Sequence, residues 1–84
     1  MFEKIVDIEA RDNYHLMAVF ENGAIREYDA RPLLETQAFA PLKEQLERFY
    51  AVKPICCGSA VAWEGSVDLA SEEIWENGRV MDSR

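Results

Sequence analysis

The pair Asn22-Gly23 constrains the fold of this chain more than any other feature. An Asn-Gly pair readily takes the two left-handed positions of a type I′ turn, which joins neighbouring antiparallel strands. It lies between two segments of strand character, 14–20 and 24–29, and so predicts a hairpin. An alternating, β-branched segment at 4–10 supplies a strand before them. The sequence therefore predicts a three-stranded antiparallel meander, with the apolar middle strand at its centre.

Two helical segments follow the meander. Pro32 ends it, because proline lacks a backbone donor and fixes φ, and a short helical turn at 31–34 is expected to lay its leucines under the sheet. Pro41 opens a helix over 42–50. The apolar residues of this helix recur at helical spacing and form one stripe, which we expect to cover the sheet. They are Leu42, Leu46, Phe49 and Tyr50.

Strand character returns at 52–57 and 60–64, and these segments predict a second hairpin. Pro54 cannot donate a ladder hydrogen bond, so it places the first of the two strands at a sheet edge or a bulge. The last helix is predicted over 71–77. Gly78 stands in the position after a helix where left-handed backbone is common.

The start of the last helix is open to two interpretations, because either Ser71 or Ala70 can occupy the capping position. Residues 79–84 are expected to fray. Together the segments predict one domain over 1–84, with an ordered core over about 3–78. Its predicted fold class is α+β: an antiparallel β meander of three strands plus a second hairpin, with two short helices packed on the sheet.

Acidic residues outnumber basic ones by 16 to 9, which gives the 84-residue chain a net charge of −7. Affinity for nucleic acid depends on Lys and Arg replacing counterions at phosphates, and this charge opposes it. Anionic membrane surfaces are disfavoured for the same reason. We therefore expect no nucleic acid and no membrane as a partner, and a small basic protein is favoured. The alternative is that the negative charge only keeps a small protein soluble.

Residue types that carry chemistry are sparse in this chain. Cys56 and Cys57 are adjacent and form neither a CxxC pair nor a disulfide framework, so we expect reduced thiols in a cytoplasmic protein. The single histidine, His15, and two adjacent cysteines do not supply ligands at structural-zinc spacing. The four glycines are isolated, so no phosphate-binding loop is formed. We expect no metal, no cofactor and no enzyme activity; an enzyme using His15 or Cys56 is the least favoured alternative.

Five segments, in order, resemble the small bacterial family known as domain of unknown function 2442. The match covers nearly all of residues 3–78. It departs from the family pattern at Ala70, where serine is usual, and at Trp75, where tyrosine is common. The segments are Phe20-Glu21-Asn22-Gly23, Asp29-Ala30-Arg31-Pro32-Leu33-Leu34, Ala38-Phe39-Ala40-Pro41-Leu42, the stretch from Trp63 to Asp68-Leu69, and Trp75 near the end of the last helix.

The resemblance implies an α+β fold without an assigned activity. Some family members are encoded beside small toxin-like partners, which implies an antitoxin-like or regulatory role. Others carry an appended helix-turn-helix, for which we expect no room in the few residues after Gly78.

We expect this chain to be a non-enzymatic protein-interaction module that binds its partner through an acidic, partly aromatic surface. The candidate partner-binding residues are Glu72, Trp75 and Glu76. If Ile74 faces the core, Trp75 is rotated from it by about 100° and is partly exposed. Exposed tryptophan is enriched among interface anchors. The alternative is that Trp75 folds back over the sheet beside Trp63.

Two further hypotheses stay open. A small-ligand sensing or regulatory domain would hold its ligand between the sheet and the 42–50 helix, in a pocket lined by Leu33, Phe39 and Phe49. A homo-oligomer is compatible with every hypothesis, because a sheet edge near Pro54 can pair with another copy, or the C-terminal hairpin can be exchanged.

Overall fold

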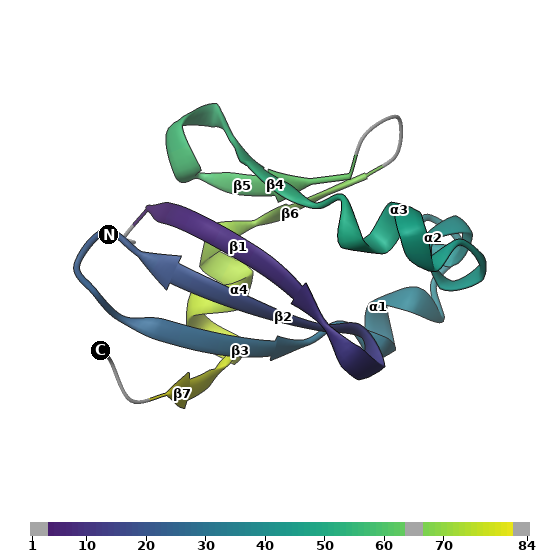
Figure 1. The fold of residues 1–84 in the computed structure, drawn as a ribbon, viewed down its shortest axis with the longest axis horizontal. Coiled ribbons are helices and arrows are strands. Elements are labelled where there is room, and N and C mark those ends of the chain that lie inside the picture. Colours follow the sequence, from purple (N-terminus) through teal and green to yellow (C-terminus); the bar gives the residue numbers. More distant parts are fainter. Residues whose placement is uncertain (1–3, 64–66, 82–84) are drawn as a thin grey trace.

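The computed structural model describes residues 4–63 and 67–81, which form two antiparallel β-sheets and four short α-helices (Figure 1). The α+β class is confirmed, with seven strands where five were expected. The strands of the larger sheet, sheet A, are in spatial order β1 (Ile5–Arg11), β2 (His15–Phe20), β3 (Ile25–Asp29) and β7 (Arg79–Met81). Those of the smaller sheet, sheet B, are β4 (Lys53–Ile55), β5 (Ala60–Ala62) and β6 (Asp68–Ala70).

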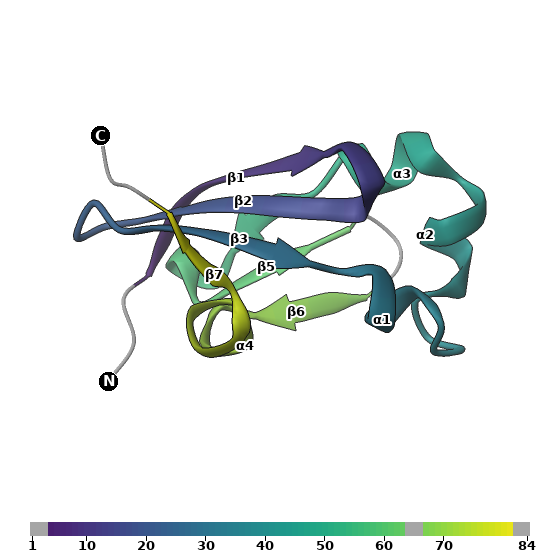
Figure 2. The same cartoon turned by 90° about the horizontal axis from the view of Figure 1, so that it is seen from below.

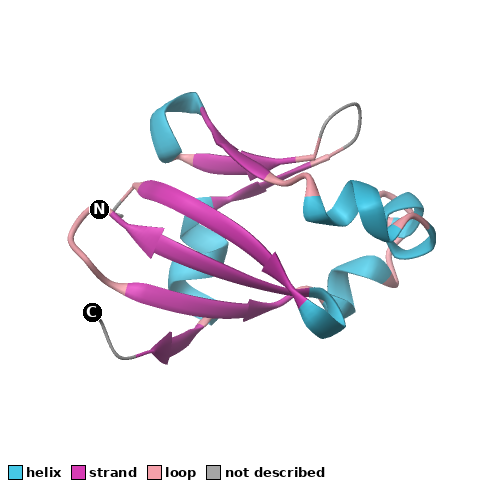
Figure 3. Cartoon of the chain, in the orientation of Figure 1, coloured by secondary structure: helices cyan, strands magenta, loops and turns pink. Residues whose placement is uncertain are grey.

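Sheet B and α4 lie on one side of sheet A, as Figure 2 shows. The helices are α1 (Arg31–Leu34), α2 (Ala40–Glu44), α3 (Leu46–Tyr50) and α4 (Ser71–Asn77). The first three gather at one end of the sheets, whereas α4 lies beneath sheet A (Figure 3). No helix of the described residues is long and apolar enough to cross a membrane. The opposite side of sheet A is covered by no helix or strand of residues 4–63 and 67–81.

The predicted meander is confirmed, with β2 hydrogen-bonded between β1 and β3. Sheet A also has a fourth strand that the sequence analysis missed. Residues 79–81, which we expected to fray, form β7 and pair antiparallel with β3, so that Met81 lies opposite Ile25 and Arg79 opposite Glu27. The paired backbone and the Arg79–Glu27 ion pair hold this segment in place. The remainder of the predicted frayed tail lies outside the described residues.

The turn between β2 and β3 is a three-residue loop rather than the type I′ turn that we predicted. The N–H of Phe20 donates to the carbonyl oxygen of Ala24 (2.8 Å), which leaves residues 21–23 in the loop. Only Gly23 has left-handed backbone, with φ of 90°. The side chain of Asn22 instead accepts a hydrogen bond from the N–H of Ala24 (2.9 Å). Loops of this length end on a left-handed residue, which glycine supplies without steric cost.

Sheet B contains the predicted second hairpin and one strand more. β4 and β5 pair antiparallel, and Pro54 lies in an edge strand, as predicted. The loop between them is a short 3-10 turn, η2 (Cys56–Gly58). β6 pairs with the other edge of β5 and was missed. A strand of three residues is too short to show the alternation from which strands are recognised.

Residues 40–50 form two helices in place of the single helix predicted over 42–50. The break lies at Gln45, whose φ of −126° and ψ of 84° are not helical. Leu42 and Phe49 are fully buried, whereas Leu46 and Tyr50 are 45% and 43% exposed. The predicted apolar stripe is therefore divided, because the break at Gln45 turns α3 so that Leu46 faces solvent.

α4 covers the predicted residues, but both of its ends differ from expectation. It begins after Ala70, which has extended backbone, and no side chain caps it. Gly78 follows it with φ of −77°, not in the left-handed region that we predicted. Glycine is needed there for space instead, because a Cβ on Gly78 would lie 2.5 Å from the carbonyl oxygen of Ile74.

One hydrophobic core joins the two sheets and the helices. Trp63, only 2% exposed, is among the largest side chains within it. Its ring stacks on that of Phe49, with 6.0 Å between the centroids, and its Nε1–H donates to the carbonyl oxygen of Phe49 (3.0 Å). The indole N–H is therefore buried with a partner, as a buried tryptophan requires.

Candidate functional site

The uncovered side of sheet A presents three rows of side chains, which we name the open face. Side chains alternate between the two faces along a strand, so every second residue of the four strands points to this side. Cross-strand pairing sorts these residues into rows. The rows are Asp7–Val19–Ile25–Met81, Glu9–Met17–Glu27–Arg79 and Arg11–His15–Asp29.

The apolar part of the open face is made by Met17, Val19, Ile25 and Met81. With the outward side chains of β1, these residues line a shallow hollow of about 260 Å³ that is open to solvent. Pockets for small molecules usually measure roughly 300–1,000 Å³ and enclose most of the ligand. The hollow is smaller and more open than that. Its shape favours contact with a macromolecule over enclosure of a small ligand.

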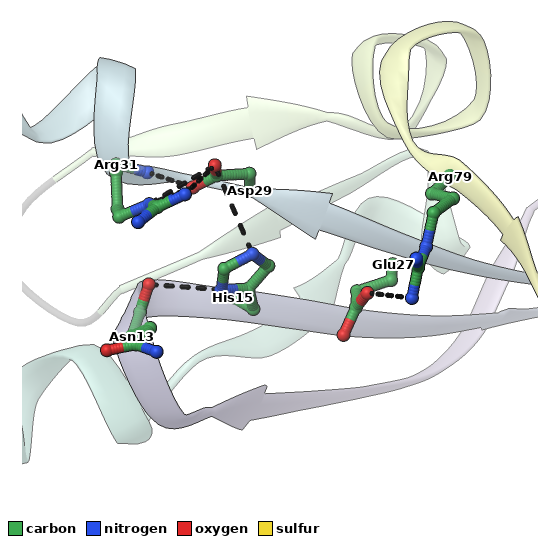
Figure 4. Close-up of polar contacts among 6 residues, drawn as sticks. All are labelled: Asn13, His15, Glu27, Asp29, Arg31 and Arg79. Carbon is green, nitrogen blue, oxygen red and sulfur yellow. Dashed lines mark hydrogen bonds and ion pairs between the residues drawn. The ribbon is translucent and has the colours of Figure 1, made fainter.

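Every arginine of the open face lies in an ion pair within this chain. Arg11 pairs with Glu9 at 2.9 Å, and Arg79 pairs with Glu27 at 2.9 Å. At the end of β3, Arg31 of α1 makes a two-pronged contact with Asp29, at 2.8 Å for the shortest distance. Figure 4 shows the pairs at Asp29 and Glu27. With Arg31 included, the open face carries four carboxylates and three guanidiniums, a net charge of −1.

The residue types of the open face match those of protein–protein interfaces only in part. Such interfaces are enriched in Met and Arg and depleted in Lys, Glu and Asp. The open face holds two methionines and no lysine, but it also holds four carboxylates. Three of its four carboxylates lie in ion pairs, whereas Asp7 forms none among the described residues. Hydrogen bonds from Arg31 lower the pKa of the Asp29 carboxyl to about 2.

His15, the least favoured catalytic candidate, lies within the third row of the open face. Its Nδ1–H donates to the carbonyl oxygen of Asn13 (3.1 Å), and its Nε2 lies 4.0 Å from Oδ2 of Asp29. The second distance is beyond hydrogen-bond reach. The Asp29 carboxylate is occupied by Arg31. The bond to Asn13 therefore fixes the imidazole ring, and among the described residues Nε2 has no hydrogen-bond partner.

A second exposed surface lies on α4, on the other side of sheet A; we name Arg26, Glu72, Trp75 and Glu76 the α4 surface. Glu72 and Glu76 are exposed and lie one helical turn apart. Trp75 is half-buried: its ring packs edge-to-face on Phe20 with 5.0 Å between centroids. The guanidinium of Arg26 covers the ring at 4.2 Å from its centroid. Trp75 therefore folds back over sheet A and is shielded by a cation.

The carboxylates around α4 are not neutralised as those of the open face are. Residues 67–78 contain four acids and no Lys or Arg. Glu73 accepts a hydrogen bond from the hydroxyl of Tyr28 (2.9 Å) and so ties α4 to β3. Burial, with the added effect of this bond, raises the pKa of Tyr28 well above its usual value. Across the described residues, Glu72 and Glu76 form no ion pair.

A family model described as "Protein of unknown function (DUF2442)" matches residues 5–80, which is most of the chain. The chain belongs to this family. The resemblance carried by its five sequence segments is thereby confirmed. Neither a curated protein nor a solved structure matches the chain.

The structure of this DUF2442 chain places all three predicted partner-binding residues on one helix, α4, where Glu72 and Glu76 flank the helical turn that carries Trp75. The open face was missed by the sequence analysis. Its signal was present in the alternation of β1, β2 and β3, where the odd-numbered positions mix charged and apolar residues. A surface made by these positions can be recognised only when the order of the strands in the sheet is known.

The cysteines of the DUF2442 chain do not form a recognisable site. Cys56 and Cys57 are both exposed free thiols in η2, and both have left-handed backbone, with φ of 53° and 61°. Within the part of the chain that the structure describes, no group of three or more His, Cys, Asp or Glu is placed to hold a metal ion.

The ligand pocket that we considered near α3 is occupied by side chains. Phe49 is fully buried and stacks on Trp63. Phe39 packs edge-to-face on the same indole, with 5.9 Å between centroids, and Leu33 packs against the core. Leu33, Phe39 and Phe49 are thus all used in packing the core.

Proposed function

We propose that this DUF2442 chain is a non-enzymatic protein-interaction module that binds a small basic protein through the α4 surface. The observation that supports the proposal is the uncompensated charge of Glu72 and Glu76. Carboxylates at i and i+4 on a helix repel each other by about 0.2–0.5 kcal/mol. Lys or Arg side chains from a partner would relieve that repulsion and would also steer the encounter.

The apolar component of the α4 surface is Trp75. Its ring packs on Phe20 and is covered by Arg26, so a partner would meet a guanidinium–indole pair rather than a bare ring. Tryptophan and arginine are the residues most enriched at energetically dominant interface positions. The α4 surface thus combines charge for steering with a large flat side chain for affinity.

The net charge of the chain and its family also support a small basic protein as the partner. A net charge of −7 favours a basic partner and disfavours nucleic acid. The toxin-like neighbours of some family members suggest an antitoxin-like or regulatory role, in which a small acidic protein occupies a basic one. We place this activity in the cytoplasm, where Cys56 and Cys57 would stay reduced.

The test is a comparison of partner capture by matched variants of the full chain. Tagged wild type, Glu72→Lys/Glu76→Lys and Glu44→Lys/Glu47→Lys are incubated in parallel with lysate of the native host, and the bound proteins are identified by mass spectrometry. Both double variants change the charge by the same amount. Glu44 and Glu47 are exposed and lie in α2 and α3, away from the α4 surface.

We expect a basic protein in stoichiometric amount with wild type and with the Glu44/Glu47 variant, and its loss with the Glu72/Glu76 variant. Loss with both variants would show a general charge effect and would contradict the assignment of the α4 surface. Retention by the Glu72/Glu76 variant would contradict it as well. Circular dichroism of each variant controls for folding.

A further inference from the structure

We propose that the turn between β4 and β5 is a dithiol site, at which Cys56 and Cys57 together bind one trivalent arsenic centre. The two cysteines match no known motif, and neither takes part in the proposed function, so either proposal can fail alone. They lie in η2, at the opposite end of sheet B from α3 (Figure 1). Both are exposed free thiols, so a ligand in solution can reach them.

The backbone of η2 brings the two thiols closer in direction than a strand would. The sequence predicts a strand that continues to residue 57, in which neighbouring side chains point to opposite faces. The structure ends β4 at Ile55, and φ is 53° at Cys56 and 61° at Cys57. For residues other than glycine, positive φ lies mostly in the left-handed helical region. Helical backbone turns successive side chains by about 100° rather than about 180°, so both sulfurs can reach one atom.

The turn that carries the thiols is held in place by its neighbours. Gly58 packs against the start of β1, where a Cβ would collide with the carbonyl oxygen of Ile5. The carbonyl oxygen of Cys56 accepts hydrogen bonds from the N–H (3.2 Å) and the hydroxyl (2.9 Å) of Ser59. The N–H of Ser71 donates to the carbonyl oxygen of Ser59 (2.9 Å) and ties the turn to α4. A ligand therefore meets two thiols on an ordered backbone, which lowers the entropic cost of binding.

The number and spacing of the thiols determine the class of ligand. Structural zinc takes four ligands, and among residues 4–63 and 67–81 no group of three or more His, Cys, Asp or Glu is placed to hold a metal ion. A direct disulfide would be strained, because Cα atoms joined by a trans peptide are about 3.8 Å apart and disulfides usually span roughly 4.4–6.8 Å. A trivalent arsenic atom in an organic arsenical needs only two thiols. It holds them at close to a right angle and closes a ring that is larger by one atom.

The reaction with an organic arsenoxide involves no oxidation. Each thiol loses its proton, two arsenic–sulfur bonds form, and the oxygen of the arsenoxide leaves as water, so arsenic stays trivalent. The second bond forms within the same molecule, and such intramolecular binding raises overall affinity by about 10²–10⁴. The pair of cysteines, rather than either one alone, is therefore the site.

Titration of the reduced full chain with phenylarsine oxide tests the proposal. Intact-mass spectrometry counts the adducts, and a colorimetric thiol reagent counts the thiols that stay free. The matched variants are Cys56→Ser and Cys57→Ser, each of which keeps one thiol in the same turn. Circular dichroism establishes that both variants fold.

We expect wild type to take up one equivalent with loss of both thiols, to keep it in excess glutathione and to release it to a small dithiol. Each serine variant should bind at least about a hundredfold more weakly. Wild type should also bind more tightly when folded than in urea, because only the folded chain holds the turn. The proposal would be overturned by a wild type without an adduct, by an adduct that leaves one thiol free, by equal binding of either serine variant, or by equal affinity in urea.

Discussion

The charged side chains on the two sides of sheet A differ in how they are paired. On the open face, each arginine has a carboxylate partner within the chain, and most of the apolar side chains lie in the neighbouring row with Val19 and Ile25. On the α4 surface, Glu72 and Glu76 have no basic partner among the described residues, and the one guanidinium is used to cover Trp75. The open face therefore presents only one carboxylate, Asp7, that lies in no ion pair among the described residues. An unsatisfied surface gains most from a partner of opposite charge.

A single β-sheet separates these two surfaces, and this explains how so small a chain can carry both. Successive residues of a strand point to opposite sides, so β2 supplies Phe20 to the core beneath α4 and Val19 to the open face. In β2 the even-numbered residues are buried in the core, and the odd-numbered ones lie on the open face. Each surface can therefore be tested without destroying the other.

The largest expected effect comes from neighbouring residues of β2. Phe20 is 1% exposed and packs on Trp75, so Phe20→Ala should lower the free energy of unfolding by about 3–5 kcal/mol. Val19→Ala, on the open face, should cost less than about 1 kcal/mol in the monomer. Urea denaturation at low protein concentration measures both. Equal costs would show that the open face is part of the core and would remove the distinction between the two sides.

The next effect concerns Gly78, which joins α4 to β7. A methyl group there would approach the carbonyl oxygen of Ile74 within 2.5 Å and the Cβ of Arg26 within 3.1 Å. Gly78→Ala should therefore lower the free energy of unfolding by about 1–3 kcal/mol. Asn77→Ala, at an exposed neighbouring position, should change it by less than about 0.5 kcal/mol. If Gly78→Ala proves neutral in denaturation, α4 is not held tightly against sheet A.

A smaller effect distinguishes Arg26, which covers Trp75, from Arg79, which lies in an ion pair on the open face. Arg26→Ala removes the cover of Trp75 and should increase quenching of its fluorescence by acrylamide, with a loss of about 0.5–1 kcal/mol in stability. Arg79→Ala, which breaks an exposed ion pair on the open face, should leave quenching unchanged and cost at most about 1 kcal/mol. Trp63 is buried and contributes a constant background. Identical quenching of the two variants would contradict the placement of Arg26.

The smallest effect is a shift in one titration on the open face. Arg31 holds the pKa of Asp29 at about 2, below its value in the unfolded chain. The carboxylate therefore adds stability above about pH 4, and that stability is lost as the pH falls towards 2. Arg31→Ala should return this pKa towards about 4. Carboxyl NMR measures it, with Arg79→Ala as the control; an unchanged pKa in Arg31→Ala would mean that the ion pair is not formed in solution.

Much of the fold follows from local sequence. The meander, the turn of helix after Pro32, the edge position of Pro54 and the span of α4 all depend on neighbouring residues, and each was predicted. β6 and β7 were not, because three-residue strands exist only through their pairing with β5 and β3. The break at Gln45 and the need for glycine at position 78 likewise arise from tertiary packing, which no local pattern records.

The two candidate surfaces also differ in how far the sequence predicted them. Glu72, Trp75 and Glu76 lie within one helix, so their grouping was predictable from helical geometry. The cover of Trp75 by Arg26 was not, because 49 positions separate the two residues in sequence. The open face was also hidden, since its rows combine residues from both ends of the chain. The ion pair of Arg79 with Glu27 depends on β7, a strand that the sequence analysis did not predict.

The central claim is that the α4 surface, and not the open face of sheet A, recognises a basic partner. The most direct test is a two-dimensional ¹⁵N NMR spectrum of the full chain, followed as a lysine-rich probe peptide is added. Our account predicts that the peptide shifts the amide signals of Glu72, Trp75 and Glu76 and leaves those of Met17, Val19 and Ile25 unchanged. If the peptide moved only the signals of the open face, or moved both sets equally, the account would be contradicted.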